Sequence, residues 1–152
     1  MIKTEDWIDY FPHEKPRPVQ EDAINRILHS FLSSDKKFFI AEMGTGCGKS
    51  AIGVTVARYL NYVVNEDIEG FGRGAYFVTT QKILQDQYVK DFGGYGPMRS
   101  IKSASNYQCV FHKNNSCAES QAMLRSVEKD TPFFKTCSGH CTYRKNKDDF
   151  LK

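Results

Sequence analysis

The sequence predicts an α/β fold in which parallel strands are joined by helical crossovers. Residues 38–41 and 75–79 are short apolar runs of the kind that form buried strands. Apolar residues at helical spacing follow each run, and they also precede the first one. The resulting order of helix, strand, helix, strand and helix is typical of a sheet built from crossover units.

Three helices are predicted with bounds. The first covers residues 18–32, because Pro18 suits a first helical turn and an apolar stripe follows it. The second covers residues 48–64 and has a broadly apolar surface, as in a buried helix. The third covers residues 81–92, and Thr80 is the predicted cap of its first turn.

The remaining segments carry weaker signals. Residues 1–17 are polar and aromatic and are predicted to be an irregular lead-in, and residues 65–74 to be an acidic surface loop. Residues 98–103 are a candidate for a third short strand, and residues 117–129 for a short helix. The pattern changes near residue 104, so we expect a domain over 1–103 and an insertion over 104–152.

Composition and charge exclude several classes of protein. The 152 residues are 40% hydrophobic and include 11 Phe and 8 Tyr, enough for a core and too many for a disordered chain. No apolar run has the ~18 residues of a transmembrane helix, and the N-terminus lacks the apolar stretch of a secretory signal. We therefore expect no membrane partner. The expected location is the cytoplasm, or the cytoplasm or nucleoid of a host cell.

The positive charge is concentrated in the C-terminal third. Residues 1–98 hold 11 Lys and Arg against 13 Asp and Glu, whereas residues 99–152 hold 10 against 5. A solvated surface explains such a balance, and so does a surface that meets phosphate backbones.

A glycine-rich segment between the first predicted strand and the second helix has the features of a phosphate-binding loop. Its glycines allow the backbone to curl around an anion, and the following helix directs its positive N-terminus at the same anion. Lys49 supplies an ammonium for the β- and γ-phosphates, and Ser50 a hydroxyl for Mg²⁺. A turn without ligand is the alternative. The residues that would hold ATP and Mg²⁺ are Gly44, Thr45, Gly46, Cys47, Gly48, Lys49 and Ser50.

Arg17 and Gln20 precede this loop at the start of the first predicted helix. An amide both donates and accepts hydrogen bonds, so Gln20 has the chemistry to recognise adenine. A polar residue in the first turn of a surface helix is equally ordinary, and these two residues alone do not decide between the readings.

Four of the five cysteines lie within 33 residues near the C-terminus. Cys109, Cys117, Cys137 and Cys141 are separated by 7, 19 and 3 residues, which is not the spacing of a zinc ribbon. Thiolates suit zinc and iron–sulfur clusters, and unligated buried thiols are a further alternative. The spacing alone does not choose among these. Cys47 lies far from the other four cysteines in the sequence and is interpreted as a thiol of the glycine-rich loop.

Three motifs in this order resemble those of superfamily 2 helicases, most closely the XPD/DinG-type iron–sulfur DNA helicases. They are Arg17-Pro18-Val19-Gln20, the loop from Glu42 to Ser50, and the Thr-rich segment from Phe77 to Gln87. The resemblance extends from about Phe11 to Tyr143. It implies a partial RecA-like P-loop NTPase domain with a cysteine-rich iron–sulfur insertion at the C-terminal end of the chain.

The resemblance also implies roles for individual residues. Gln20, with Arg17, would recognise adenine, and Lys49 and Ser50 would act in ATP hydrolysis. Single-stranded DNA or DNA junctions would be the partner, held near Thr79, Thr80 and Gln81.

The same resemblance implies that the four late cysteines hold a [4Fe–4S] cluster, with zinc as the alternative. His112 and His140 are considered as substitute zinc ligands. Tyr107 and Phe111 could stack on bases, although core packing is the simpler role. The basic residues of this region would then face DNA; they are Lys113, Arg125, Lys129, Lys135, Arg144, Lys145 and Lys147.

The sequence lacks an Asp-Glu-x-His motif, an arginine finger and a second motor domain, all of which helicase chemistry needs. We therefore expect a fragment, a truncated product or one part of a split helicase whose remainder is a separate chain. Such a chain would bind nucleotide weakly and hydrolyse ATP negligibly alone. Two other functions remain open: a non-catalytic module that binds nucleic acid or a partner, and another P-loop ATPase with a structural zinc site.

Overall fold

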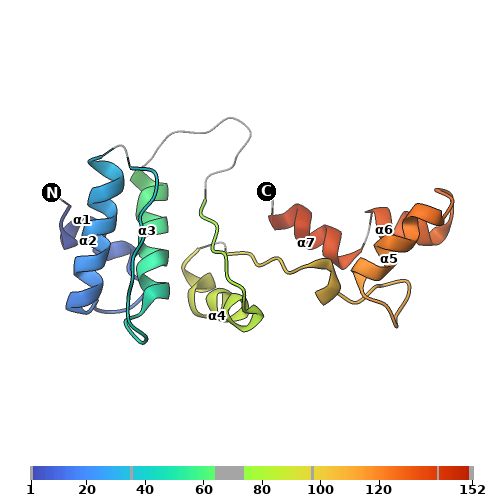
Figure 1. Cartoon of the computed structure of the whole chain (residues 1–152), viewed down its shortest axis with the longest axis horizontal. Helices are drawn as coiled ribbons and strands as arrows, with labels where there is room; N and C mark the ends of the chain where they lie inside the picture. Colours follow the sequence, from blue (N-terminus) through green and yellow to red (C-terminus); the bar gives the residue numbers. More distant parts are fainter. Residues whose placement is uncertain (1, 35, 64–73, 97, 140, 151–152) are drawn as a thin grey trace. The chain divides into compact units, whose positions relative to one another are not determined.

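A computed structural model describes residues 2–34, 36–63, 74–96, 98–139 and 141–150. In this part of the chain the regular structure is helical (Figure 1). The chain divides into two compact units. The first unit contains Met1–Val78 with Gly94–Gly96, and the second contains Thr79–Gly93 with Pro97–Lys152.

The first unit is built on two helices that lie side by side (Figure 1). They are α2 (Pro18–Leu32) and α3 (Lys49–Val63), and both match the predicted helices closely. Their shared core is apolar, and it contains Trp7, Phe11, Ile24, Leu28, Ala51, Ile52 and Tyr59. Each fully buried aliphatic side chain in such a core stabilises the fold by roughly 1.5–3 kcal/mol.

The predicted irregular lead-in contributes to this core, so that prediction is wrong. It contains α1 (Thr4–Trp7) and the 3-10 helix η1 (Ile8–Tyr10). Trp7 is completely buried, and its indole N–H donates to Asn25 Oδ1 at 2.7 Å. Because Asn25 of α2 accepts the indole hydrogen bond, the Trp7 ring can be buried without an unpaired N–H. A segment too short to show periodicity thus contributes a core side chain.

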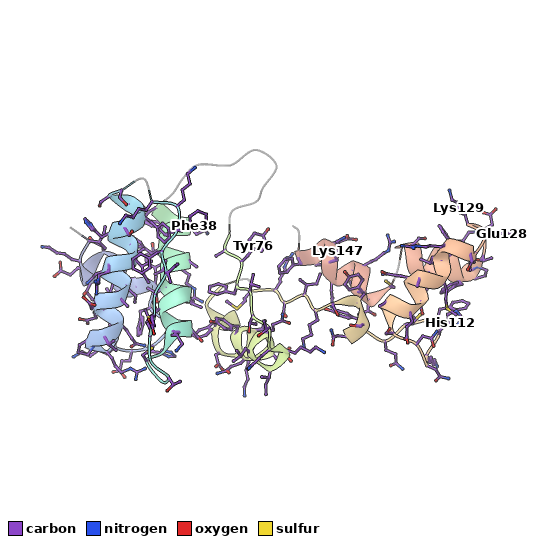
Figure 2. All side chains as sticks on the ribbon, viewed as in Figure 1. Phe38, Tyr76, His112, Glu128, Lys129 and Lys147 are labelled. Atoms are coloured by element: carbon purple, nitrogen blue, oxygen red, sulfur yellow. The ribbon has the colours of Figure 1, made fainter. Side chains whose placement is uncertain are left out.

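The segments predicted as strands carry no regular structure among the described residues. Phe38, Ile40 and Val78 are 85%, 95% and 95% exposed, and Phe38 and Tyr76 are labelled in Figure 2. A strand needs a hydrogen-bonded neighbour, and none pairs with these segments in the part of the chain described. The parallel sheet and the RecA-like fold therefore remain predictions.

The second unit consists of short helices. They are α4 (Lys82–Phe92), η3 (Ala104–Asn106), α5 (Cys117–Met123), η4 (Leu124–Ser126), α6 (Pro132–Gly139) and α7 (Thr142–Phe150), and η2 (Gly93–Tyr95) follows α4 directly. The sequence predicted α4 closely, but it did not predict α6 or α7. The candidate strand over 98–103 does not form.

Two local predictions in this unit are corrected. Thr80 does not cap α4; the residue before the helix is Gln81, whose N–H donates to the Thr79 hydroxyl at 3.3 Å. The predicted helix over 117–129 ends as α5 at Met123 and tightens into a 3-10 turn.

A capping box fixes the start of α5. The Ser116 backbone N–H and hydroxyl both donate to Glu119 Oε2, at 2.7 and 2.8 Å, and Ser116 Oγ accepts from the Glu119 N–H at 3.3 Å. The hydrogen bonds from Ser116 hold the pKa of Glu119 below its usual value. The carboxylate that caps the helix is therefore ionised at neutral pH.

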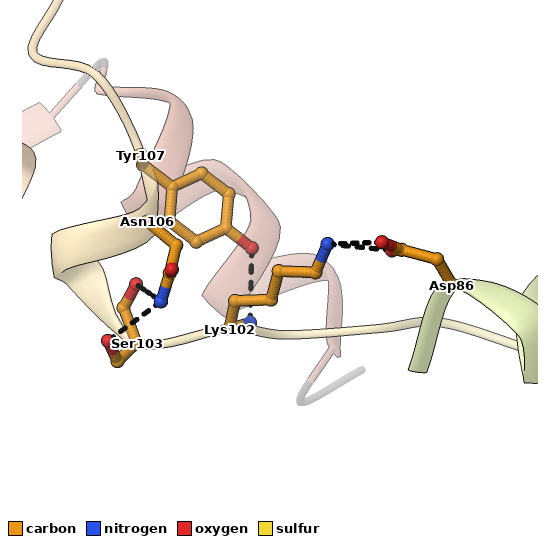
Figure 3. A network of polar contacts seen from close by, with 5 residues as sticks. All are labelled: Asp86, Lys102, Ser103, Asn106 and Tyr107. Atoms are coloured by element: carbon orange, nitrogen blue, oxygen red, sulfur yellow. Dashed lines mark hydrogen bonds and ion pairs between the residues drawn. The ribbon is translucent and has the colours of Figure 1, made fainter. Parts of the chain in front are cut away.

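A polar network links α4 to the segment before the first late cysteine (Figure 3). Lys102 Nζ contacts both carboxylate oxygens of Asp86, at 2.7 and 2.8 Å. The Lys102 backbone N–H donates to the Tyr107 hydroxyl at 3.2 Å, and Asn106 Nδ2 donates to Ser103 Oγ at 3.0 Å. This network orients Tyr107, whose ring packs 5.5 Å from that of Tyr143.

None of the helices in the described ranges combines the length and the apolar character needed to cross a bilayer.

The two leucines of α2 provide a matched test of the core. Leu28 is fully buried and Leu32 is 36% exposed. We expect Leu28→Ala to lower the free energy of unfolding by about 2–5 kcal/mol, because it leaves a cavity between α2 and α3. Leu32→Ala should lower it by less than about 1 kcal/mol. Urea unfolding measures both, and equal losses would contradict the packing described.

Candidate nucleotide site and cysteine cluster

The loop between the first apolar segment and α3 is curled. Gly46 and Gly48 have φ angles of 75° and 80°, in the left-handed region that residues with a Cβ rarely adopt. Such glycines let successive backbone amides form an anion-binding concavity. An extended loop would have contradicted the phosphate-binding hypothesis, and the backbone at Gly46 and Gly48 is not extended.

The helix that follows is positioned as the hypothesis requires. α3 begins at Lys49, directly after the loop, and its first hydrogen bond runs from the Ile52 N–H to the Gly48 carbonyl at 3.2 Å. The opening turn leaves several backbone N–H groups without partners inside the helix, and the helix dipole adds positive potential there. Met43, at the start of the loop, packs against the core of the first unit.

The Lys49 side chain folds back across the loop. Its ammonium donates to the Gly44 carbonyl at 2.7 Å and to the Met43 carbonyl at 3.2 Å. The Cys47 thiol also donates to the Gly44 carbonyl, at 3.1 Å. The Lys49 ammonium, which the sequence analysis assigned to the phosphates, is therefore bound by carbonyls of the loop.

Arg17 and Gln20, from the start of α2, lie against Gly48. Gln20 is 3% exposed, and its Oε1 accepts from the Arg17 backbone N–H at 2.9 Å. A Cβ at Gly48 would collide with Gln20 Nε2 and lie 2.9 Å from an Arg17 guanidinium nitrogen. Two motifs that are distant in the sequence thus meet at the loop.

The part of the third motif that is predicted to bind DNA, Thr79–Gln81, lies in the second unit. Thr79 is half-buried, whereas Thr80 and Gln81 are exposed. Thr79 accepts a hydrogen bond from the Gln81 N–H, and the Gln81 carbonyl accepts from the N–H groups of Leu84 and Gln85 at the start of α4.

The four late cysteines are all buried and close together in the second unit. Cys109, Cys117, Cys137 and Cys141 are 3%, 2%, 3% and 2% exposed, and all are free thiols. Burial, followed by the neighbouring sulfur of Cys109, raises the pKa of Cys137 to about 11. Burial and the nearby Cys141 likewise raise the pKa of Cys117. Electrostatic interactions therefore join Cys137 to the other three thiols, and Cys117 to Cys109 and Cys141.

Hydrogen bonds surround two of these sulfurs. The His112 N–H donates to Cys109 Sγ at 3.2 Å, and the Arg144 N–H donates to Cys141 Sγ at 3.4 Å. Burial raises the pKa of Cys109, but donors from Ser120, His112 and Phe111 outweigh burial, so its pKa lies below its usual value. Donors of this kind stabilise a thiolate, the form in which cysteine binds metals.

The thiols do not form a closed metal site as they stand. Among the described residues, no three His, Cys, Asp or Glu side chains are arranged so that they could hold a metal ion. The His112 ring packs 4.6 Å from that of Phe133. The other histidine considered as a ligand, His140, lies outside the described residues.

The basic residues singled out in the sequence all lie on the surface of the second unit. Lys129 and Lys147 are labelled in Figure 2. Phe111 is 45% exposed, although its ring also packs 5.3 Å from that of Phe133. Tyr107 is half-buried and bonded through its hydroxyl, so its role is at least partly structural.

Comparison with protein families agrees with the loop and motif geometry. Residues 13–136 match the family described as type III restriction enzyme, res subunit. The chain belongs to this family. The res-subunit family is a superfamily 2 helicase family, whose members are helicase-like, ATP-dependent motors on nucleic acids. The coarser part of the resemblance drawn from the sequence is thus confirmed.

The match to the res-subunit family includes Arg17, Gln20, the whole phosphate loop, Thr79–Gln81 and the first two late cysteines. Cys137 and Cys141 lie beyond it. No curated protein and no solved structure matches the chain.

Sequence reasoning overlooked two features of these sites. The Met43 and Gly44 carbonyls, which bind Lys49, carry no sequence signal because every residue has a carbonyl. Ser120, which is completely buried, lies three residues after Cys117 on α5. That i, i+3 spacing places the two on one helical face and could have revealed it.

Two loop glycines provide a matched test of the contact with α2. Gly48 has a positive φ and would collide with Gln20 if it carried a Cβ, whereas nothing lies within 4 Å of a Cβ at Gly44. We expect Gly48→Ala to lower the free energy of unfolding of the first unit by about 1–2 kcal/mol or more. Gly44→Ala should change it by less than about 0.5 kcal/mol. Thermal unfolding compares them, and a harmless Gly48→Ala would show that the contact is absent.

Proposed function

We propose that this chain is the ATP-binding portion of a DNA helicase that couples ATP hydrolysis to unwinding and contacts DNA through a [4Fe–4S] domain. One observation carries the proposal. Arg17 and Gln20 lie against Gly48, so groups suited to a base and groups suited to a triphosphate form one continuous site. The buried Gln20 amide also serves the fold, because its oxygen caps the first turn of α2.

Adenine recognition is assigned to Gln20, with Arg17 beside it. The Gln20 amide oxygen already accepts from Arg17, so its orientation is fixed by a backbone hydrogen bond. The amide nitrogen faces Gly48 and is positioned to donate to a ring nitrogen of the base. Because Gln20 is buried, little side-chain entropy remains to be lost on binding.

Phosphate and Mg²⁺ binding are assigned to the rest of the loop. The Lys49 ammonium exchanges the Met43 and Gly44 carbonyls for β- and γ-phosphate oxygens, a stronger pairing because both partners are charged. Ser50 offers its hydroxyl to Mg²⁺. The sequence contains no acidic motif to orient the attacking water, so this chain alone should turn over ATP negligibly.

The four buried thiols are assigned to the cluster. In number and softness they suit [4Fe–4S], although the described residues include no arrangement of three or more ligands that could hold a metal ion. The donors that already reach Cys109 and Cys141 are of the kind that support metal-bound thiolates. When bound, the cluster would fix the short helices of this unit together.

DNA contact is assigned to the surface around the cysteines. A shallow hollow of about 450 Å³ adjoins Cys109, and Tyr107, Val110 and Lys113 are among its lining residues. An aromatic ring beside a lysine can stack a base while the ammonium meets the phosphate. Thr79, Thr80 and Gln81 would add contacts to the DNA backbone. The alternative is a module that binds nucleic acid without hydrolysis.

Lysine substitution tests the nucleotide site. We expect Lys49→Ala to weaken binding of Mg²⁺-ATP about 10- to 100-fold, the loss of one charge-assisted contact. Lys36→Ala removes an equal charge from an exposed position before the loop and should have little effect. Isothermal titration gives both affinities. Equal affinities would remove the nucleotide assignment and favour the non-hydrolysing module, whose affinity for DNA would not depend on Lys49.

Anaerobic reconstitution with iron and sulfide tests the cluster. We expect a brown protein with about four iron atoms per chain, whose colour Cys137→Ser abolishes and Cys47→Ser leaves unchanged. Cys47 is the matched control because it is the one cysteine assigned to the phosphate loop. Colourless protein with one bound zinc would replace the cluster with a structural zinc site.

A further inference from the structure

Lys102 is the centre of the polar network drawn in Figure 3. Its ammonium contacts both oxygens of the Asp86 carboxylate, at 2.7 and 2.8 Å, and its backbone N–H donates to the Tyr107 hydroxyl at 3.2 Å. All three residues belong to the second unit. Lys102 therefore connects a carboxylate of α4 to an aromatic ring that lies close to the first late cysteine in the sequence.

The Tyr107 backbone is also held by hydrogen bonds. Its N–H donates to the Ala104 carbonyl at 3.3 Å, and its carbonyl accepts from the Cys117 N–H at 2.7 Å. The Tyr107 ring packs 5.5 Å from that of Tyr143. Because the backbone and the hydroxyl of Tyr107 are both bonded, the ring has little freedom left to lose when a ligand meets it.

The ring of Tyr107 lines the hollow of about 450 Å³ that adjoins Cys109. Lys113 lines the same hollow, whereas Lys102 and Asp86 are not among the described residues that form its wall. The Asp86 side chain is 63% exposed, and an ion pair this accessible to water adds little to the stability of a fold. The pair is thus better placed to orient the ring than to stabilise the unit.

We propose that Asp86 and Lys102 are positioning residues for nucleic-acid binding. Their ion pair fixes the backbone at Lys102, and that backbone holds the Tyr107 ring in the wall of the hollow, where it stacks on a base. This role rests on the proposed assignment of the hollow to single-stranded DNA. A ring that is already fixed stacks at a lower entropic cost than a free one. A carboxylate therefore favours the binding of a polyanion, although its charge alone would oppose it.

Removal of the carboxylate separates positioning from charge. Asp86→Ala deletes a negative charge, so electrostatics alone predicts tighter binding of DNA, whereas the loss of positioning predicts weaker binding. We expect Asp86→Ala to raise the dissociation constant for a labelled single-stranded oligothymidylate about three- to tenfold, part of the value of one stacked base. Fluorescence anisotropy with the whole chain measures this constant.

Two further variants control for the substitution itself. Asp86→Glu keeps the carboxylate and should restore the affinity of the wild type. Asp91→Ala removes an exposed carboxylate near the end of the same helix, outside this network, and is the matched control. It should bind the oligothymidylate as tightly as the wild type or more tightly, because it removes only a repulsive charge.

Salt dependence and a double variant show how the affinity is lost. Asp86→Ala should leave the slope of log affinity against log salt unchanged, because it removes no phosphate contact, whereas Lys113→Ala should reduce that slope by about 0.7. Tyr107→Phe keeps the ring and removes the hydroxyl that accepts from Lys102. Combined with Asp86→Ala, it should weaken binding no more than either change alone, because both remove the same restraint.

The possible results distinguish this role from the assignment of the hollow. If the wild type does not bind the oligothymidylate, or if Tyr107→Ala leaves its affinity unchanged, the hollow does not bind DNA and the positioning role fails with it. If Tyr107→Ala weakens binding but Asp86→Ala does not, the hollow stands and the positioning role is wrong. A melting temperature lowered by Asp86→Ala but not by Asp91→Ala would also overturn the role, because the ion pair would then serve the fold itself.

Discussion

The contact of Gln20 and Arg17 with Gly48 is the constraint on which the first unit depends. It is possible because Gly48 has no Cβ and adopts a left-handed backbone, so the side chains from α2 can reach the loop. The same contact fixes where α3 begins relative to the start of α2. The core between the two helices is formed by residues that follow these starts in each helix. The residues proposed to bind the nucleotide are therefore also residues that hold the two helices in register.

The second unit has a different physical basis. Its apolar core is small, with Phe133 and partly buried Leu124 and Val127 packed around Cys109 and Cys137. Four thiols fill space that aliphatic side chains would fill in an ordinary domain. Thiols pack as small hydrophobic groups, but burial and then the neighbouring thiols raise the pKa of Cys117 and Cys137. A bound metal would relieve that cost, because it neutralises the thiolates it binds.

Much of the first unit was predictable from local signals. The bounds of α2 and α3 followed from Pro18 and from apolar periodicity, which depend on residues close in the sequence. Trp7 was missed because α1 is too short to show a period, and its burial depends on Asn25, 18 residues away. Strand formation at residues 38–41 depends on pairing with distant residues, so local composition could suggest strands there without determining them.

By itself, the sequence determined the chemistry of the loop, the two long helices around it and a set of thiols suited to a metal, because residue type and short spacing fix these properties. Only the tertiary structure decided that Gln20 lies on Gly48, that Lys49 rests on loop carbonyls, and that the Trp7 indole meets Asn25. These contacts join residues whose separation in space is set by the packing of whole helices. No pattern along the chain encodes such a distance directly.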